Sequence, residues 1–196
     1  MISNNKQIQK GFSLIELVLT LIIISVMLTL AAPAFTNIYE DNAQAANANK
    51  FISSLTLARS EAVTRNINVV MCRLNSSDNG CATTGFWEDG WVIWADTDGD
   101  GVLEETNQNG DVEVIYSEEE LENGYTIRAL NNQFSNTISF SPIGEASGNA
   151  GSGQEIFRLC DPDNDNDKTR LIYLSGAGNA WVNRISGSNV AATNCT

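Results

Sequence analysis

The most pronounced hydrophobic pattern in the chain is a run of 21 residues, Leu14 to Ala34, that contains a single charged side chain, Glu16. Its length matches the roughly 20 apolar residues that an α-helix needs to cross the hydrocarbon core of a bilayer. An unpaired carboxylate at mid-bilayer costs about 2.5 kcal/mol or more, so its presence indicates a specific role. The pattern therefore predicts a membrane-spanning helix in which Glu16 needs a cationic partner.

A second helical pattern follows directly. The segment from Thr36 to about Arg65 has no Gly or Pro and is rich in Ala. One helical face of it carries Phe51, Leu55, Ala58 and Ala62, which we interpret as positions that pack into a core. Joined to the first run, this segment predicts one helix of about 54 residues, or about 80 Å at 1.5 Å per residue.

After Asn66 the pattern changes to short runs of β-branched and aromatic residues separated by turn residues. These runs predict strands at Val69–Arg73, Phe86–Ala95, Val112–Ser117, Tyr125–Leu130, Thr137–Phe140, Ile156–Cys160, Arg170–Ser175 and Ala180–Ile185. The segments 141–144 and 175–178 read as tight turns, and 144–153 as a flexible Gly/Ser/Ala loop. We expect a meandering sheet.

Four cysteines, at positions 72, 81, 160 and 195, change this picture by adding possible cross-links. Of the three ways to pair them, we favour a bridge between Cys72 and Cys81 around a Ser/Asn/Gly loop and a bridge between Cys160 and Cys195 that holds the C-terminus. A zinc site is the alternative, but the chain has no histidine and no Cys-x-x-Cys pair.

An acidic segment carries the one candidate cofactor site. Asp96, Asp98 and Asp100 alternate before Gly101, which is the spacing of the first half of an EF-hand calcium loop. Position twelve is Asn107 where the loop requires a bidentate glutamate. A solvated hairpin turn therefore explains the segment better than a calcium ion, which we keep as a hypothesis. With no histidine to act as a general base, we expect no enzymatic activity.

The N-terminal sequence Lys10-Gly11-Phe12-Ser13-Leu14-Ile15-Glu16-Leu17 resembles the prepilin peptidase signal of type IV pilins and type II secretion pseudopilins. The resemblance implies cleavage between Gly11 and Phe12, N-methylation of Phe12 and a role for Glu16 in assembly. An ordinary secretory signal would have a shorter apolar stretch without a carboxylate. A plain single-pass anchor explains the length of the run but neither Gly11 nor Glu16, and a buried core helix explains the pattern least well.

The head resembles the pilin-like GspH/FimT/FimU family. The segments that carry this likeness are Leu57–Ala62, Gly90–Asp96, Phe140–Gly144, Leu159-Cys160 and Leu171–Ser175. It implies an α+β, pilin-like fold in which a long N-terminal helix packs on an antiparallel β-sandwich-like head. Some members bind DNA, and the resemblance associates this with a Gly-Arg-x-Arg motif. Here that place reads Gly178-Asn179-Ala180-Trp181, so both arginines are absent. Trp181 could stack on a base, but we expect it in the core.

Charge supports the same conclusion about nucleic acid. The formal net charge is −13, and removal of a leader containing Lys6 and Lys10 leaves nine Lys and Arg against 24 Asp and Glu. The resulting side-chain charge of −15 repels nucleic acid and anionic headgroups, so we do not expect nucleic acid as a partner. The roughly 160 residues beyond the apolar run suit one globular head.

These observations predict four segments: a leader at 1–11, a transmembrane and assembly helix at 12–35, the amphipathic second half of the helix at 36–66, and a β-rich head at 67–196. The expected function is that of a minor pilin or minor pseudopilin. The precursor would be held in the inner membrane with its head outside the cytoplasm. Prepilin peptidase would then process it, and it would join major and other minor subunits at or near a pilus or pseudopilus tip. The alternatives are a tip-exposed module for DNA uptake or adhesion, and a calcium-binding extracytoplasmic domain.

Overall fold

The computed structural model of the chain describes residues 11–74, 81–99, 103, 113–148, 151–163 and 169–184, and of residues 30–35, 37 and 123 it describes the backbone alone. The chain divides into two compact units, of which the first ends at Glu40 and the second begins at Asp41.

The helix α1 (Leu14–Arg65) is continuous over 52 residues, close to the length that the sequence predicts. It ends where Asn66 adopts a left-handed conformation with φ 57°. Asn is one of the residues that accept this conformation readily, and a residue of this kind after the last turn is a common way to stop a helix. Within the part of the chain whose side chains are described, no helix combines the length and apolarity that crossing a membrane requires.

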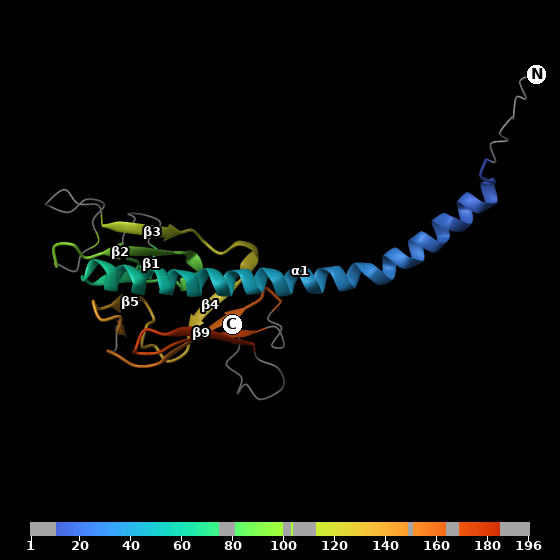
Figure 1. Cartoon of the computed structure of the whole chain (residues 1–196). Helices are drawn as coiled ribbons and strands as arrows, with labels where there is room; N and C mark the ends of the chain where they lie inside the picture. The colour runs from blue at the N-terminus through green and yellow to red at the C-terminus, as the bar shows by residue number, and fades with distance from the viewer. Residues whose placement is uncertain are drawn as a thin grey trace, which may run out of the picture. The chain divides into compact units, whose positions relative to one another are not determined.

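The head consists of two antiparallel sheets, which confirms the predicted sandwich-like arrangement (Figure 1). In spatial order, the five-stranded sheet contains β3 (Val114–Glu118), β2 (Trp91–Ala95), β1 (Val69–Arg73), β5 (Thr137–Phe140) and β6 (Ala146–Gly148). The four-stranded sheet contains β4 (Thr126–Ala129), β7 (Glu155–Cys160), β8 (Arg170–Leu174) and β9 (Ala180–Arg184). Two short 3₁₀ helices, η1 (Trp87–Asp89) and η2 (Glu122–Gly124), lie in the connections.

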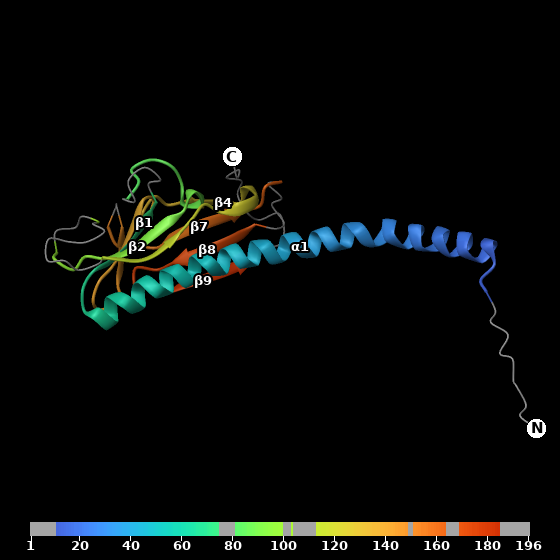
Figure 2. The same ribbon diagram turned by 90° about the horizontal axis from the view of Figure 1, so that it is seen from above.

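The part of α1 that follows Asp41 covers the core between these sheets (Figure 2). The predicted core face is confirmed, since Phe51, Leu55, Ala58 and Ala62 are at most 1% exposed. The Phe51 ring makes edge-to-face contacts with Trp91 of one sheet and Phe157 of the other, with ring centroids 5.2 and 5.0 Å apart. Such pairs contribute about 0.5 to 1.5 kcal/mol each beyond their buried area, so Phe51 joins the helix to both sheets.

A second, smaller apolar cluster lies on the other face of the five-stranded sheet. Because alternate residues of a strand point to opposite faces, Val70 and Cys72 of β1 and Val92 and Trp94 of β2 all lie there, next to one another. Leu103 packs against this cluster from the long β2–β3 connection. Both faces of β1 and β2 are therefore buried, which explains their continuous hydrophobic sequences.

The expectation of one meandering sheet is wrong, because the strands form two sheets in which β1 pairs with β5 and β4 pairs with β7. Two expectations about individual strands are also wrong. The segment 144–153, expected as a flexible loop, contains β6, whose residues pair with β5 at Phe140↔Ala146 and Ile138↔Gly148. The predicted strand Phe86–Ala95 is a strand only from Trp91, because its first part forms η1. In both cases backbone pairing with other elements decides the structure, and a local sequence pattern does not report that pairing.

Candidate functional site

The first candidate site is the N-terminal start of α1. Leu17 N donates to Ser13 O at 3.2 Å, so helical hydrogen bonding begins immediately after Gly11 and Phe12. A Cβ atom added at Gly11 would meet no atom within 4 Å, so the fold itself does not require glycine here. The described structure therefore gives no steric reason for glycine at this position.

The surface of this helical segment is apolar and uncovered within the first unit. Its large exposed hydrophobic side chains are Phe12, Leu14, Ile15, Leu17, Val18, Leu19, Leu21, Ile22, Ile23, Ile24, Val26, Met27 and Leu28. Phe12 is 84% exposed. A contiguous apolar surface of this extent marks a site that contacts other proteins or lipid.

The polar side chains in the same segment differ in whether they have a hydrogen-bond or ion-pair partner. The hydroxyl groups of Thr20, Ser25 and Thr29 donate to the carbonyl oxygens three residues earlier, at 2.7 to 2.8 Å. Glu16, in the first turn of α1, has no hydrogen bond or ion pair within the part of the chain that the structure describes. Glu16 is therefore the charged side chain of this segment that is free to pair with a group from another molecule.

The second candidate site is an acidic cluster at the β2–β3 connection. Carboxylate oxygens of Asp96, Asp98 and Glu113 all lie within 4.8 Å of one another. Oxygen ligands bind calcium at about 2.3 to 2.6 Å, so two ligands on opposite sides of one ion are about 4.8 Å apart. The spacing fits a calcium ion, with these three residues as its protein carboxylate ligands.

Glu113 is the member of this cluster that the sequence analysis missed, while the expected Asp100 lies outside the described residues. Ala95 N donates to Glu113 O at 2.8 Å, and this pairing of the two strand ends brings Glu113 beside Asp96. Glu113 could have been identified from the predicted hairpin. It lies opposite Ala95 at the end of β2, next to the first residue of the acidic segment.

Local hydrogen bonds hold the cluster in place. Thr97 donates to Glu113 Oε1 through its backbone N at 3.2 Å and its hydroxyl group at 3.0 Å. Gly99 N donates to Asp96 Oδ1 at 2.8 Å. Glu113 is fully buried, whereas Asp98 is exposed, so the cluster opens to solvent on one side only.

The cysteines follow the favoured pairing as far as the structure describes them. Cys72 and Cys81 form a disulfide with a Cα–Cα distance of 5.4 Å. Cys160 is also disulfide-bonded, but Cys195 lies outside the described residues, so its role as the partner stays a prediction. A structural disulfide indicates an oxidising compartment.

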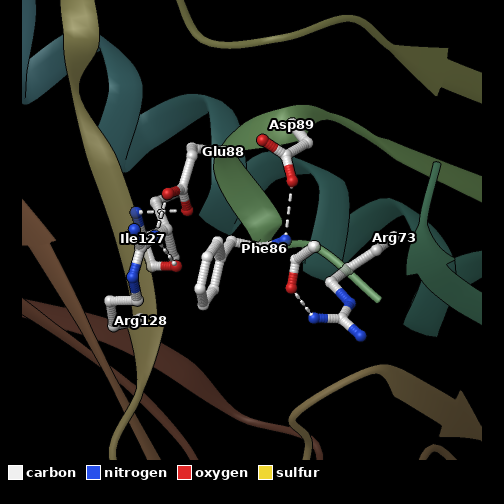
Figure 3. A network of polar contacts seen from close by, with 7 residues as sticks. Arg73, Phe86, Glu88, Asp89, Ile127 and Arg128 are labelled. Carbon is white, nitrogen blue, oxygen red and sulfur yellow. Dashed lines mark hydrogen bonds and ion pairs between the residues drawn. The ribbon is translucent and has the colours of Figure 1, made fainter. Parts of the chain in front are cut away.

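A third polar group is formed by residues of β1, of β4 and of the segment 85–89 (Figure 3). Arg128 pairs with Glu88 Oε1, and its guanidinium carbon lies 3.7 Å from the centre of the Phe86 ring. Arg73 Nη1 donates to Gly85 O. Burial lowers the pKa of Arg73, although Asp89 opposes this through its negative charge, and burial also lowers the pKa of Arg128. No signal in the sequence identified this pair of arginines.

Strand β9 begins at the place where the Gly-Arg-x-Arg motif of the DNA-binding members would lie, and it carries an aromatic side chain there. Trp181 on β9 stacks on Tyr173 with ring centroids 5.2 Å apart and an angle of 5° between the ring planes. It is 40% exposed, so the expectation that Trp181 lies in the core is wrong. The register of β8 and β9 places both rings on the outer face of the sheet. Arg184, at the end of β9, pairs with Asp41 at 3.1 Å.

Comparison with known proteins gives two matches to family models and several to solved structures. Residues 47–178 match the family described as type II transport protein GspH, and residues 6–32 match the prokaryotic N-terminal methylation motif. The type IV minor pilin FimU from Pseudomonas aeruginosa aligns with a TM-score of 0.53 and 20% identity, over 83% of this chain and 99% of that one.

A second solved structure is the minor pseudopilin EpsH from the type 2 secretion system of Vibrio cholerae. It aligns with a TM-score of 0.46 and 12% identity, over 70% of this chain and 94% of that one. No curated protein sequence matches the chain significantly. The likeness to FimU supports the fold described above.

Proposed function

Because the chain belongs to the family of the type II transport protein GspH and is a subunit of the minor pilin or pseudopilin class, we propose that it is processed after Gly11 and assembled at or near the tip of a filament. The filament is a type IV pilus or a type II secretion pseudopilus. The role is structural: the subunit helps to initiate assembly with other minor subunits. Its partners are prepilin peptidase and the major and minor subunits of the same machine.

The observation that carries this proposal is the isolated carboxylate of Glu16 on an exposed apolar helix surface. Cleavage after Gly11 creates an α-amino group at Phe12, four residues from Glu16. In an assembly the amine of one subunit pairs with Glu16 of its neighbour while the apolar surfaces cover each other. Pairing removes an uncompensated charge from an apolar environment, which makes the docked state favourable.

Before assembly, the apolar surface of this helix must be buried in a different environment. We propose that the precursor is held in the inner membrane by the segment 12–35, with the head outside the cytoplasm. The disulfide between Cys72 and Cys81 supports that orientation, because disulfides persist in oxidising compartments. The proposed boundaries of leader, assembly helix and head remain those expected from the sequence.

The test is expression of the full chain with its prepilin peptidase and its partner subunits, followed by mass spectrometry of the mature protein and quantification in sheared filaments. Wild-type protein should begin at an N-methylated Phe12. Gly11→Ser should retain the leader. Glu16→Ala should lose the leader normally but enter filaments at least tenfold less, since removing one partner from a buried ion pair costs about 3 to 5 kcal/mol.

Two further variants test whether the effect of Glu16→Ala is specific to the charge at position 16. Glu61→Ala removes a glutamate from the same helix that is paired with Arg65 within the head unit, and it should assemble normally. Glu16→Asp keeps the charge on a shorter side chain and should retain part of the incorporation. Normal filament entry of Glu16→Ala, or a mature terminus other than methylated Phe12, contradicts the proposal.

Calcium binding by the acidic cluster is the second candidate function. The supporting observation is the approach of Asp96, Asp98 and Glu113, which come from two sides of the β2–β3 connection. A bound calcium ion would join the ends of two strands at the start of a long connection. The melting temperature of the wild-type protein and of Asp98→Asn, with and without calcium, tests this function.

A further inference from the structure

The four-stranded sheet has an outer face that points away from the core. On β7, Phe157 and Leu159 belong to the core, so Arg158 and Cys160 lie on the opposite, outer face. A large side chain on an uncovered sheet face is exposed to solvent. Arg158 is nevertheless only 4% exposed, and Cys160 is fully buried. The outer face of β7 is therefore covered.

The neighbouring side chains on this face do not explain that burial. Arg158 lies opposite Arg128 of β4 and Leu171 of β8, and both of these are themselves only half-buried. Arg128 is directed toward Glu88, with which it forms an ion pair. The Nε of Arg158 has no hydrogen-bond partner within the described residues, and burial lowers the pKa of this arginine. The cover therefore comes from outside the described residues.

The exposure of side chains on this face increases from β7 toward β9. Leu171 of β8, next to Arg158, is half-buried. Asn183 of β9 lies opposite Leu171 and is exposed, and Trp181 on the same strand is 40% exposed. The cover thus lies over β7 and leaves the outer face of β9 open to solvent.

We propose that residues 185–196, which follow β9, dock on this face as a strap that is bonded to Cys160 through Cys195. Cys160 is disulfide-bonded, and Cys72 bonds to Cys81. Cys195 is then the one cysteine of the sequence that is left to bond to Cys160 within a single chain. A bridge at this position brings the strap to the outer face of β7, where the burial is observed.

The strap starts at the end of the sheet where Cys160 lies. Arg184, the last residue of β9, pairs with Arg170 of β8, and Arg170 pairs with Leu159, next to Cys160. Adjacent strands are about 4.8 Å apart, so β9 and β7 are separated by about 10 Å. Residues 185–195 span up to about 36 Å at about 3.3 Å per residue. The strap is therefore long enough to cross β8 and to lie over β7.

The composition of the strap suits a place beside a buried guanidinium group. Residues 185–196 contain no Lys, Arg, Asp or Glu. The strap therefore brings no positive side chain to repel Arg158, and its backbone carbonyl oxygens are acceptors for guanidinium N–H groups. Ile185 and Val190 add apolar side chains. A strap in this place closes the outer face of β7 to other subunits, so that β9 keeps the part of the face that remains accessible.

Photo-crosslinking of the full chain in detergent micelles tests this cover. The photoreactive residue p-benzoylphenylalanine replaces Leu171, beside Arg158 on the outer face, and mass spectrometry identifies the cross-linked peptides. The expected product is a cross-link within one chain from position 171 to residues 185–196. The same photoreactive residue in place of the exposed Tyr116, on the five-stranded sheet, is the control and should not capture this segment. A cross-link from position 171 to a second chain or to another segment, or no cross-link to residues 185–196, overturns the proposal.

Modification of arginine side chains by phenylglyoxal gives a second readout. In a Cys160→Ser variant that ends at Arg184, and so lacks the strap, Arg158 should react about tenfold faster than in the full chain. Arg73 is the matched control, because it is 6% exposed but lies on β1 of the other sheet, and it should stay protected. Unchanged protection of both arginines overturns the proposal. Faster reaction of both reports unfolding, and the cross-link from position 171 in the full chain then decides.

Discussion

Arg59 reaches from α1 to the turn between β5 and β6, where its Nε donates to Gly144 O at 3.0 Å. Its Nη1 and Nη2 donate to Asn179 Oδ1 and Ala177 O, both at 3.0 Å, in the turn between β8 and β9. One side chain on the helix therefore ties together a turn from each sheet. Arg59 lies in one of the segments that carry the family likeness, and these bonds give a physical reason for arginine there.

Arg59→Met should destabilise the head by about 2 to 3 kcal/mol, because it removes charge-assisted hydrogen bonds to two turns. Urea unfolding measures the difference in the free energy of unfolding. Arg65→Met is the control, since it removes only an exposed pair with Glu61 four residues earlier and should change stability by less than about 0.5 kcal/mol. Equal effects of the two substitutions would refute the proposed role of Arg59.

Gly178→Ala should be at least as destabilising, for a different reason. Gly178 has φ +77°, and a Cβ atom there would lie 2.1 Å from Gly144 O. Both the backbone conformation and the close approach of the two turns oppose any side chain. Gly151→Ala makes a useful comparison, because Gly151 also has a positive φ of +105° but has nothing within 4 Å of an added Cβ. The difference between the two variants isolates the steric part, measured by thermal unfolding.

The disulfide between Cys72 and Cys81 lies on the outer face of the five-stranded sheet and links residues nine positions apart in the sequence. Replacing both cysteines with alanine should lower the free energy of unfolding by about 2 to 3 kcal/mol. Chemical reduction of this double variant then acts on Cys160 alone among the described cysteines. A further loss of about 2 to 5 kcal/mol would support the predicted bridge to Cys195, and no further loss would contradict it.

Calcium should raise the melting temperature if Asp96, Asp98 and Glu113 bind it. Asp98→Asn should abolish that rise, because a neutral amide replaces an exposed carboxylate of the cluster. Asp163→Asn is the control for general charge effects, since Asp163 is exposed and lies outside the cluster. Absence of any calcium effect on the wild-type protein, or an unchanged effect in Asp98→Asn, rules out this site.

The ion pair between Lys50 and Glu118 predicts a dependence of stability on pH. Burial by itself would raise the pKa of Glu118, but hydrogen bonds from Tyr116 and Lys50 and the charge of Lys50 together hold it below the ordinary value of 4.5. The pair therefore contributes fully above pH 4.5, and its contribution is lost as the pH falls through the lower folded-state pKa.

Lys50→Met should accordingly be less stable than wild type at neutral pH, by less than about 1 kcal/mol because Lys50 is partly exposed. The two proteins should become equally stable at low pH. Urea unfolding from pH 7 to pH 2.5 follows this difference. A difference that stays constant over the whole range would show that Lys50 acts through packing of its stem and not through Glu118.

The sequence predicted the fold well where local patterns and packing agree. The core face of α1 follows from the spacing of Phe51, Leu55 and Ala58, and strands β1 and β5 begin and end at the predicted residues. By contrast, β6 consists of Ala146, Ser147 and Gly148, which have low strand propensity. Its position is set by hydrogen bonds to β5, and no local pattern records them.

The candidate sites also divide into those that local sequence predicts and those that depend on contacts between distant segments. Gly11, Phe12 and Glu16 lie within six consecutive residues of the sequence, so their motif is readable without a structure. Glu113 and Arg128 reach their sites only through strand pairing across long connections. A reader of the sequence can anticipate Glu113 from the hairpin that follows Trp94, but the meeting of Arg73 and Arg128 depends on how the two sheets pack.

The hydroxyl groups of Thr20, Ser25 and Thr29 donate to carbonyl oxygens of their own helix, so they are not free to bond to a neighbouring subunit in a filament. A helix whose surface offers no other polar contact slides and rotates along a neighbour with little change in energy. A single charged pair at the first turn then makes one axial offset the lowest in energy. In the proposed filament, the stagger between successive subunits would be set near Glu16, while the remaining contacts would tolerate bending and extension.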